Sequence, residues 1–326
     1  MKIRSIGVAV QFIIFVVAAT YAAPARTQGS YPSKPIYLIC SSAAGGTSDL
    51  ISRAIAEGLS RSMGQPVIVE NQPGANGLIA TERVARAAPD GYVLLSAVDT
   101  NLTVNPHLYR SASDTLKELI PISLLTRGSL ALMVGASGPN NLQDLIAFAR
   151  KNPKKLNYGS VGLGSDHHLG MEEFKLKTKI DVVHIPFRGT AALNNAILGG
   201  QIDMAFTSAG QAKPLLDSGR AKVLAQAWPQ RSPLIPDVPT MSEAGVPGFE
   251  LDFWYAFVAP AKTPQEIIDR LVQEVKKAVA DDNFRKAMNV QGLEPVGSTP
   301  AELEEVVRKD SEKWRRVIEI TGTKVQ

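Results

Sequence analysis

Short apolar segments alternate with segments of helical periodicity along most of this chain, and this alternation limits the possible folds more than any other feature. Residues 36–40 form an apolar run bounded by prolines and small residues, as buried strands do, and residues 50–63 repeat apolar side chains at helical spacing. Strands at 66–70 and 92–97 and a helix at 78–87 continue the pattern. Strands separated by helices of this length pair in parallel, with helices on both faces. We therefore predict an α/β fold with mainly parallel sheets.

The same alternation returns in the second half of the chain. Helices are expected at 142–150, 165–176, 191–198 and 211–218, and strands at 156–158, 182–185, 203–206 and 223–227. The tail adds a strand at 253–260 and helices at 264–280 and 301–320. Trp314 falls on the apolar face of the last helix, which predicts a place in the core.

The length of the chain favours two domains. A chain of 326 residues corresponds to two domains of about 150 residues, each long enough to bury a core of its own. We place a hinge in the apolar stretch 124–134, which contains Gly128. A second crossing is expected near 225–229, where a proline-rich sequence begins.

Charge and cysteine content exclude several classes of function. The formal net charge of +4, from 35 basic and 31 acidic residues, is small and dispersed, so no nucleic-acid partner is expected. Cys40 is the only cysteine, which excludes an internal disulfide and a cysteine-based zinc cluster. Adjacent His167 and His168 point in different directions on a helix and lack the spacing of a zinc motif. We therefore predict neither a metal nor a cofactor.

The first 25 residues have the outline of a secretory signal peptide. Lys2 and Arg4 precede an apolar run over 6–19, and small residues follow up to Ala25, the expected cleavage point. The unbroken apolar stretch is too short to span a bilayer, which needs about 20 residues. These features predict a soluble exported protein.

Two loops that each follow a strand and precede a helix are the best candidates for a binding site. The first is 41–49, rich in serine and glycine, and the second is 159–168. In open α/β sheets, ligands bind beyond the carboxyl ends of the strands, where helix N-termini present free N–H groups to anions. A tight turn with a helix cap explains the first loop equally well. Two such loops could close on one carboxylate from both sides.

The sequence gives no positive argument for catalysis. A triad could be drawn from Ser48, His168 and Asp49, but no Gly-x-Ser-x-Gly motif occurs. Cys40 ends an apolar strand and lacks a Cys-His signature, so a buried hydrophobic role is favoured. We therefore do not expect an enzyme.

Short motifs in a fixed order give the sequence a clear resemblance. From Tyr31 to the C-terminus the chain resembles the Bug family, the periplasmic solute receptors of tripartite tricarboxylate transporters. The motifs that carry the resemblance are Tyr31-Pro-Ser-Lys-Pro35, Ala44-Gly-Gly-Thr-Ser-Asp49, Val69-Glu-Asn-Gln-Pro-Gly-Ala75, Ala88-Pro-Asp-Gly-Tyr92, Leu156-Asn-Tyr-Gly-Ser160, His184-Ile-Pro-Phe-Arg-Gly189, Leu198-Gly-Gly-Gln-Ile-Asp203 and Pro236-Asp-Val-Pro-Thr240.

The resemblance implies a two-lobed type II periplasmic binding protein of the Venus flytrap kind. Residues 31–127 and 229–326 would form lobe 1, and residues 128–228 would form lobe 2. Such a receptor, expected to be a monomer, captures a small organic carboxylate and delivers it to the permease subunits in the membrane. Two alternatives are an exported α/β hydrolase acting on carboxylates and a receptor used for signalling rather than uptake.

The resemblance also implies which residues bind the ligand. Carried onto matching positions, they are Gly46, Thr47 and Ser48 in one lobe and Ser160, Ser165 and His168 in the other, with Thr190 and Thr207 at further strand ends. Arg188 could pair directly with an anion, and an exposed or structural ion pair explains this residue equally well. One departure is Ser41-Ser42, where the family has proline followed by an aromatic residue. Residues 253–255, Phe-Trp-Tyr, could supply replacement apolar surface or pack in the core.

Overall fold

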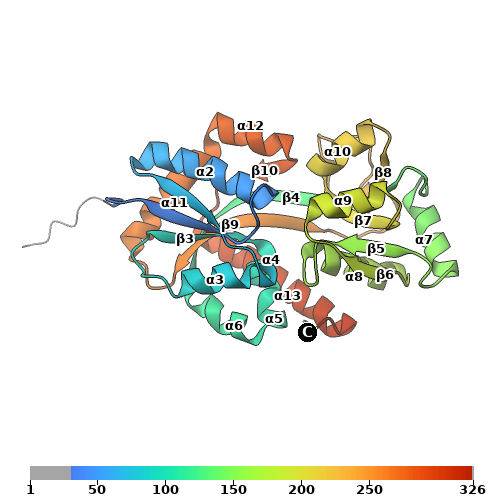
Figure 1. The fold of residues 1–326 in the computed structure, drawn as a ribbon, viewed down its shortest axis with the longest axis horizontal. Helices are drawn as coiled ribbons and strands as arrows, with labels where there is room; N and C mark the ends of the chain where they lie inside the picture. The colour runs from blue at the N-terminus through green and yellow to red at the C-terminus, as the bar shows by residue number, and fades with distance from the viewer. Residues whose placement is uncertain (1–30, 325–326) are drawn as a thin grey trace, which may run out of the picture. The chain divides into compact units, whose positions relative to one another are not determined.

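The apolar segments pair into one ten-stranded mixed sheet in a computed structural model that describes residues 31–324. The predicted signal peptide lies outside the described residues. The strand order is β2-β1-β3-β9-β4-β7-β5-β6, with β10 and β8 also paired to β4 (Figure 1). The strands are β1 (Ile36–Cys40), β2 (Val67–Asn71), β3 (Val93–Val98), β4 (Leu119–Gly135), β5 (Asn157–Ser160), β6 (Val183–Pro186), β7 (Met204–Ser208), β8 (Ala221–Gln226), β9 (Asp252–Pro260) and β10 (Leu293–Pro295).

The helices cover both faces of this sheet. In Figure 1, α2 and α12 lie above the strands on one side of the molecule and α3, α5 and α6 lie below them. On the other side, α9 and α10 lie above and α8 lies below. The helices are α2 (Thr47–Met63), the short 3-10 helix η2 (Ala75–Gly77), α3 (Leu78–Ala85), α4 (Asp99–Thr103), α5 (Asn105–Leu108), α6 (Arg110–Lys117), α7 (Leu142–Lys151), α8 (Asp166–Thr178), α9 (Thr190–Leu198), α10 (Ala209–Asp217), α11 (Gln265–Ala280), α12 (Asp282–Val290) and α13 (Pro300–Thr321).

Helix ends follow the local capping chemistry of the sequence. Gly64 ends α2 in the left-handed conformation, at φ 70°, where its N–H donates to the carbonyl of Ser60 at 3.1 Å. Thr299 and Glu302 form a capping box at the start of α13, with Pro300 at its first position. These signals explain why the predicted helices and the observed ones agree to within a few residues.

The outer strands pair in parallel, and the pairs that the central strands β4 and β9 form are antiparallel. β1 pairs in parallel with β2 and β3, and β5 pairs in parallel with β6 and β7. β9 is antiparallel to β3 and β4, and β4 is antiparallel to β7, β8 and β10. The α/β fold is as predicted, but the sheet is mixed rather than mainly parallel, because β9 runs antiparallel to its neighbours β3 and β4, and β4 in turn runs antiparallel to β7.

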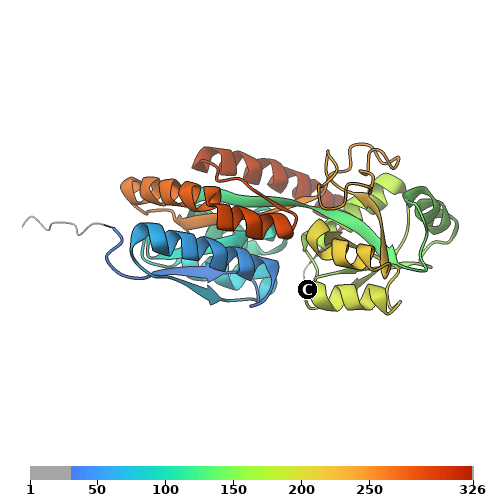
Figure 2. The ribbon, with the colours of Figure 1, turned by 90° about the horizontal axis from the view of Figure 1, so that it is seen from above.

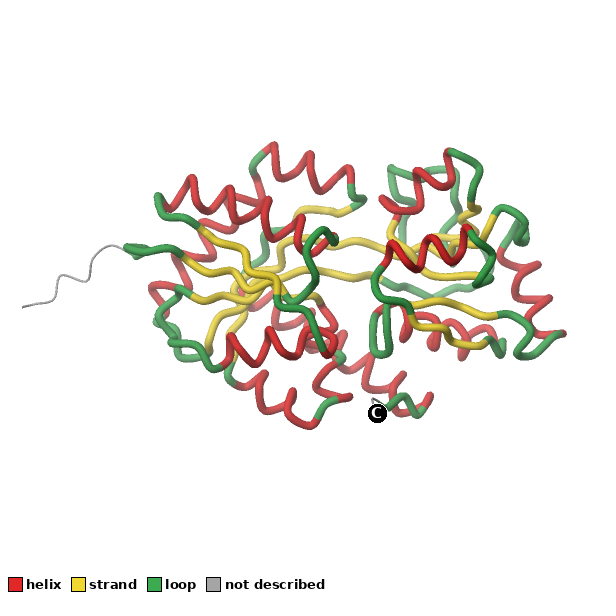
Figure 3. Tube along the Cα trace, viewed as in Figure 1, coloured by secondary structure: helices red, strands yellow, loops and turns green. Residues whose placement is uncertain are grey.

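The long strand β4 connects two groups of strands. Its first part, Leu119 to Ser129, pairs with β9, and from Leu130 onward it pairs with β7. Seen from above, β4 runs as one continuous ribbon from the first group into the second (Figure 2), and the tube view shows β4 and β9 side by side between them (Figure 3). The change of partner lies next to the hinge expected around Gly128, inside a strand rather than a loop.

Each group of strands has its own hydrophobic core. One core gathers side chains of β1, β3, β4, β9, α3 and α13 around Trp254, and the other gathers side chains of β4, β7, α9 and α10 around Leu193 and Ile197. Trp314 is buried, at 2% exposure, as its helical position predicts. Among the helices of residues 31–324, none combines the length and the apolar character that crossing a bilayer requires.

Candidate functional site

A pocket of about 560 Å³ opens where the strands end and the helices begin. Its walls come from the loops β1–α2, β2–α3, β3–α4, β5–α8 and β6–α9, with Tyr255 of β9 between them. This is the position at which open α/β sheets bind ligands. Its lining residues are Ser41–Ser48, Pro73, Gly74, Asn76, Gly77, Val98, Thr100, Asn101, Val161, Ser165, Asp166, His167, Arg188–Ala191 and Tyr255.

The first wall is the loop that leads into α2. Gly46, Thr47 and Ser48 all line the pocket, and Gly46 is the N-cap of α2. Asp49 holds the loop in place, because its carboxylate accepts hydrogen bonds from the Gly45 N–H at 3.0 Å and from Arg53 at 3.1 Å. Burial alone would raise the pKa of Asp49, but these hydrogen bonds lower it. The first turn of α2 therefore faces the pocket with its free N–H groups.

The second wall is the loop that leads into α8, and Ser165 shapes it. Ser165 is the N-cap of α8, where its hydroxyl accepts from the His168 N–H at 3.3 Å and donates to the Gly162 carbonyl at 2.7 Å. The hydrogen of this hydroxyl is thus donated to the Gly162 carbonyl within the loop. Ser165 lines the pocket chiefly as the residue that orients the start of α8.

Replacement of Ser165 by alanine is expected to lower the free energy of unfolding by about 1 kcal/mol, because α8 loses its cap. Urea unfolding measures the change. Ser165→Asn is the matched control, since asparagine is also a good N-cap acceptor and should retain the stability of the wild type. An equal loss in both variants would contradict the capping role.

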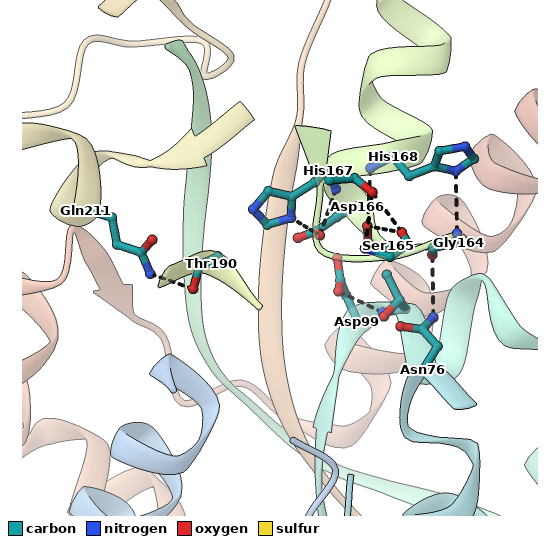
Figure 4. Close-up of polar contacts among 12 residues, drawn as sticks. Asn76, Asp99, Gly164, Ser165, Asp166, His167, His168, Thr190 and Gln211 are labelled. Atoms are coloured by element: carbon teal, nitrogen blue, oxygen red, sulfur yellow. Dashed lines mark hydrogen bonds and ion pairs between the residues drawn. The ribbon is translucent and has the colours of Figure 1, made fainter. Parts of the chain in front are cut away.

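The third wall is the loop that leads into α9. Arg188 is exposed and lines the pocket, followed by Gly189, the N-cap of α9. The Thr190 hydroxyl accepts a hydrogen bond from Gln211 at 3.3 Å, as drawn in Figure 4. The starts of α2, α8 and α9, together with the Arg188 guanidinium, give the pocket donors suited to an anion.

The structure places Ser160, His168 and Thr207 away from the pocket lining. Ser160 is fully buried and its hydroxyl lies 2.7 Å from Nε2 of His184. His168 accepts from the Gly164 N–H at 3.4 Å and its ring centroid is 4.4 Å from that of His184. Burial and the nearby His184 lower the pKa of His168 to about 4, so its ring is uncharged at neutral pH. These residues support the loop from behind.

Thr207 lies on β7 and is fully buried. Its hydroxyl has no hydrogen-bond partner among the described residues. The site residues expected from the sequence therefore form two sets. Ser160, His168 and Thr207 lie behind the pocket lining. The residues that the fold brings together around the pocket are Gly46, Thr47, Ser48, Ser165, Arg188 and Thr190.

Sequence reasoning missed the acidic and histidine side chains at the start of α8. Asp166 and His167 both line the pocket, and Nδ1 of His167 lies 2.6 Å from Oδ1 of Asp166 (Figure 4). Burial raises the pKa of Asp99 well above its usual value, and the charge of Asp166 raises it further. Burial alone would raise the pKa of Asp166 too, but the charge and hydrogen bonds of His167 lower it. The feature of the sequence that could have pointed to these two side chains is their position directly after Ser165, the N-cap of α8.

Asn76 and Asn101 form a further part of the wall that the sequence did not single out. The Asn76 side chain donates to the Asn105 side chain at 2.9 Å and to the Gly164 carbonyl at 3.4 Å, which joins the β2–α3 loop to the β5–α8 loop. The Asn101 side chain donates to the Asn76 carbonyl at 2.8 Å. The only signal for Asn76 was its place in a turn-rich loop.

Two observations bear on metal binding and nucleophilic chemistry at the site. Within the part of the chain that the structure describes, no group of three or more His, Cys, Asp and Glu side chains could hold a metal ion. Ser160 and His184 form a serine–histidine pair, but Ser160 is completely buried and lies outside the pocket lining. The donors on the pocket walls suit the binding of an anion.

Comparison with known proteins fits this geometry. Residues 51–323 match the model of the tripartite tricarboxylate transporter family receptor, TctC. A UPF0065 protein of Bordetella pertussis is 33% identical over 314 residues, which cover 96% of this chain and 97% of that protein.

Solved structures of the same kind superpose closely. The periplasmic binding protein BugD has a TM-score of 0.81 at 31% identity and covers 91% of this chain and 100% of its own. Rpa4515 of R. palustris, solved with adipate, has a TM-score of 0.82 at 31% identity over 90% of this chain and 98% of its own. MatC of Rhodopseudomonas palustris, with bound malate, has a TM-score of 0.80 at 29% identity and covers 88% of this chain and 100% of its own. The resemblance to the Bug proteins is thus confirmed, and the chain belongs to the tripartite tricarboxylate transporter family of receptors.

Proposed function

We propose that this receptor captures a small organic carboxylate in the pocket and passes it to a membrane permease without transforming it. The observation that carries the proposal is the convergence of the starts of α2, α8 and α9 on one pocket, with Arg188 beside them. Unpaired N–H groups at helix N-termini favour negative charge, and a carboxylate accepts several such bonds at once. The adipate of Rpa4515 and the malate of MatC are ligands of this class.

The mechanism that we propose is closure of two lobes over the ligand. Residues 31–127 with 229–326 would form lobe 1, which supplies Thr47, and residues 128–228 would form lobe 2, which supplies Arg188. A ligand that contacts both walls binds the closed form better than the open form and shifts the population by that difference in affinity. The hydrogen bond from the Asn76 side chain to the Gly164 carbonyl would then join the two lobes directly in the closed form.

The remaining parts of the proposal concern where the receptor works and with what. We propose that residues 1–25 direct export and are removed, so that the receptor acts as a monomer in the periplasm. Its partners would be the permease subunits of a tripartite tricarboxylate-type transporter. The absence of enzymatic activity is part of the same proposal, supported by the burial of Ser160 away from the pocket.

Thermal unfolding of ligand-free protein against mono-, di- and tricarboxylates, aromatic acids and amino acids tests the function. An acid at 100 times its dissociation constant is expected to add about 2.7 kcal/mol to the free energy of unfolding, because it binds only the folded chain. The midpoint should then rise by several degrees with one class of acid. No rise with any acid, in protein shown to be ligand-free, would contradict carboxylate binding.

Substitution of Thr47 tests whether the rise in unfolding temperature comes from acid bound in this pocket. Thr47→Ala removes a hydroxyl from the pocket wall and is expected to weaken acid binding. Thr115→Ala is the matched control, because the Thr115 hydroxyl donates to the Ser111 carbonyl within α6, outside the pocket lining.

A further inference from the structure

A second cavity, of about 530 Å³, lies beside β4 where this strand changes partners. One side of it is formed by residues 127–129, the last of β4 to pair with β9. One wall is the turn from α12 into β10, and the other is the segment 228–234 that follows β8 (Figure 1). The described residues that line this cavity are all different from those that line the pocket. A cavity of this size can hold a small organic molecule.

The two walls of the cavity belong to different groups of strands. β10 pairs with the first part of β4, so the wall between α12 and β10 is attached to the first group. The segment 228–234 is attached to the second group through Gln226 of β8, whose buried side chain accepts from the Ser232 N–H at 2.8 Å and donates to the Ile235 carbonyl at 3.0 Å. Ile235 also belongs to the hydrophobic core of the second group. A movement of one group relative to the other would therefore change the shape of the cavity.

The side chains around the cavity suit a flat aromatic molecule. Trp228 is half-buried and lines the cavity, with Leu234 on the same wall and Leu293 on the opposite one. The guanidinium carbon of Arg127 lies 5.8 Å from the centre of the Trp228 ring. Aromatic rings stack both on one another and on guanidinium planes, so a ligand ring placed here would gain contacts of both kinds.

The charges around the cavity favour a ligand that is neutral and carries an oxygen acceptor. Arg127 forms an ion pair with the Asp252 carboxylate through Nη2, whereas its Nε is buried and has no hydrogen-bond partner among the described residues. Buried N–H groups are nearly always paired, and a carbonyl oxygen would supply the acceptor. Arg231 is paired with Glu243 at 2.9 Å, and Glu294 adds a further carboxylate to the lining. The positive charges are therefore already balanced, which disfavours an anion.

We propose that this cavity binds a small uncharged aromatic compound with its ring against Trp228 and a carbonyl oxygen at Nε of Arg127, and that its occupancy strengthens carboxylate binding in the pocket. The second part rests on the proposed function. A compound that fits the cavity favours the arrangement of the two groups of strands seen here. In the same arrangement, the hydrogen bond from Asn76 to the Gly164 carbonyl joins two walls of the pocket. Each ligand would thus favour the form that the other binds.

Titration with benzamide, followed by tryptophan fluorescence and by calorimetry, tests the site. Of the three tryptophans, Trp254 and Trp314 are buried at 0% and 2% exposure, so the emission of Trp228 is expected to change. Cyclohexanecarboxamide has the same amide without the aromatic ring and is expected to bind about threefold to tenfold more weakly. Benzylamine keeps the ring but carries a cation in place of the carbonyl, and it is expected not to bind.

Trp228→Leu is expected to weaken benzamide binding by about threefold to tenfold and to remove the fluorescence change. Phe148→Leu is the matched control, because Phe148 is an exposed aromatic residue of α7 outside both the cavity and the pocket lining. If the Trp228 variant fails to fold, the comparison of benzamide with cyclohexanecarboxamide on the wild type still decides the question. Equal binding of the two amides, or an unchanged affinity in folded Trp228→Leu, would overturn the assignment.

The effect on the pocket is measured by titrating adipate and malate with and without saturating benzamide. The dissociation constant of the acid that binds is expected to fall by about fivefold or more, and benzamide should bind more tightly by the same factor when the acid is present. Benzamide that binds without this effect would overturn the coupling between the two sites. If neither acid binds, the second part of the proposal fails together with the proposed function, and the benzamide titration still decides the cavity.

Discussion

Replacement of Gly210 by alanine is expected to lower the free energy of unfolding by about 1–3 kcal/mol, the usual cost of overpacking. Gly210 lies in the first turn of α10, and a Cβ there would come within 2.3 Å of the Gln291 carbonyl oxygen and 2.5 Å of its carbon. Both are backbone atoms, so no side-chain rotation can relieve the contact. Urea unfolding at 25 °C measures the loss.

Gly46→Ala is the control for this substitution. Gly46 has an ordinary φ of −83°, and the nearest atom to an added Cβ is the Ala43 carbonyl oxygen at 3.6 Å. The free energy of unfolding of Gly46→Ala should fall by no more than about 0.5–1 kcal/mol, the difference between glycine and alanine as N-cap residues. An unchanged midpoint in Gly210→Ala would mean that α10 and the 291–292 segment separate freely, against the contact seen here.

Trp254→Phe is expected to cost about 2–4 kcal/mol, from a lost hydrogen bond and a partly empty site in the core. Trp254 is fully buried on β9, and its indole N–H donates to the Asp310 carboxylate of α13 at 2.6 Å. Burial raises the pKa of Asp310, and the indole N–H opposes this rise. Without the donor, the pKa of Asp310 rises further in the folded state.

The sign of the pH dependence follows from that shift. A carboxyl whose pKa is higher in the folded state stabilises the fold in its protonated form, and this contribution is lost as the pH rises from the unfolded value through the folded one. The deficit of Trp254→Phe should therefore be larger at about pH 7 than at about pH 5. Urea unfolding at the two pH values measures the deficit in Trp254→Phe. The double variant Trp254→Phe/Asp310→Asn, which lacks the ionisable carboxyl, is measured in the same way for comparison. A deficit independent of pH, or unaltered by Asp310→Asn, would contradict it.

The sequence predicted the outer strands and their helices well, because each is a local pattern with a clear end. The helix expected to end at Gly64 does so, and the strand at 36–40 is observed in full. The helices between 99 and 117 were missed, since they are short and shaped by contacts such as that of the His107 ring with the Ser311 hydroxyl of α13. Such contacts between distant segments leave no periodic signal.

The central strand was missed for a related reason. The apolar stretch around Gly128 suggested a hinge and no strand was predicted there, but β4 runs through it from 119 to 135. A Cβ at Gly128 would lie 2.7 Å from side-chain atoms of Leu293 and Phe253, so the glycine permits close packing by β10 and β9. This role of Gly128 becomes visible only once the neighbouring strands β9 and β10 are known.

The candidate site shows the same limit at the level of single side chains. Both loops chosen from the sequence line the pocket, but the sequence could not tell which of two adjacent histidines would face it. On α8, the side chains of His167 and His168 leave the helix about 100° apart, and the fold turns His167 towards the pocket. Among the aromatic residues of β9, Tyr255 lines the pocket and Trp254 fills the core, as the alternation of a strand requires.

The pairing of β9 with β3 joins segments that lie far apart in the sequence, which bears on the order in which they fold. Leu95 and Val258 are register partners although most of the chain separates them, so the first group of strands stays incomplete until the C-terminal part is present. The strands β5, β6 and β7 lie close together in sequence, and their pairings close much shorter loops. Rates of folding fall as the sequence separation of contacts grows. We therefore expect the strands of the middle segment to pair early, and the first group of strands to be completed last.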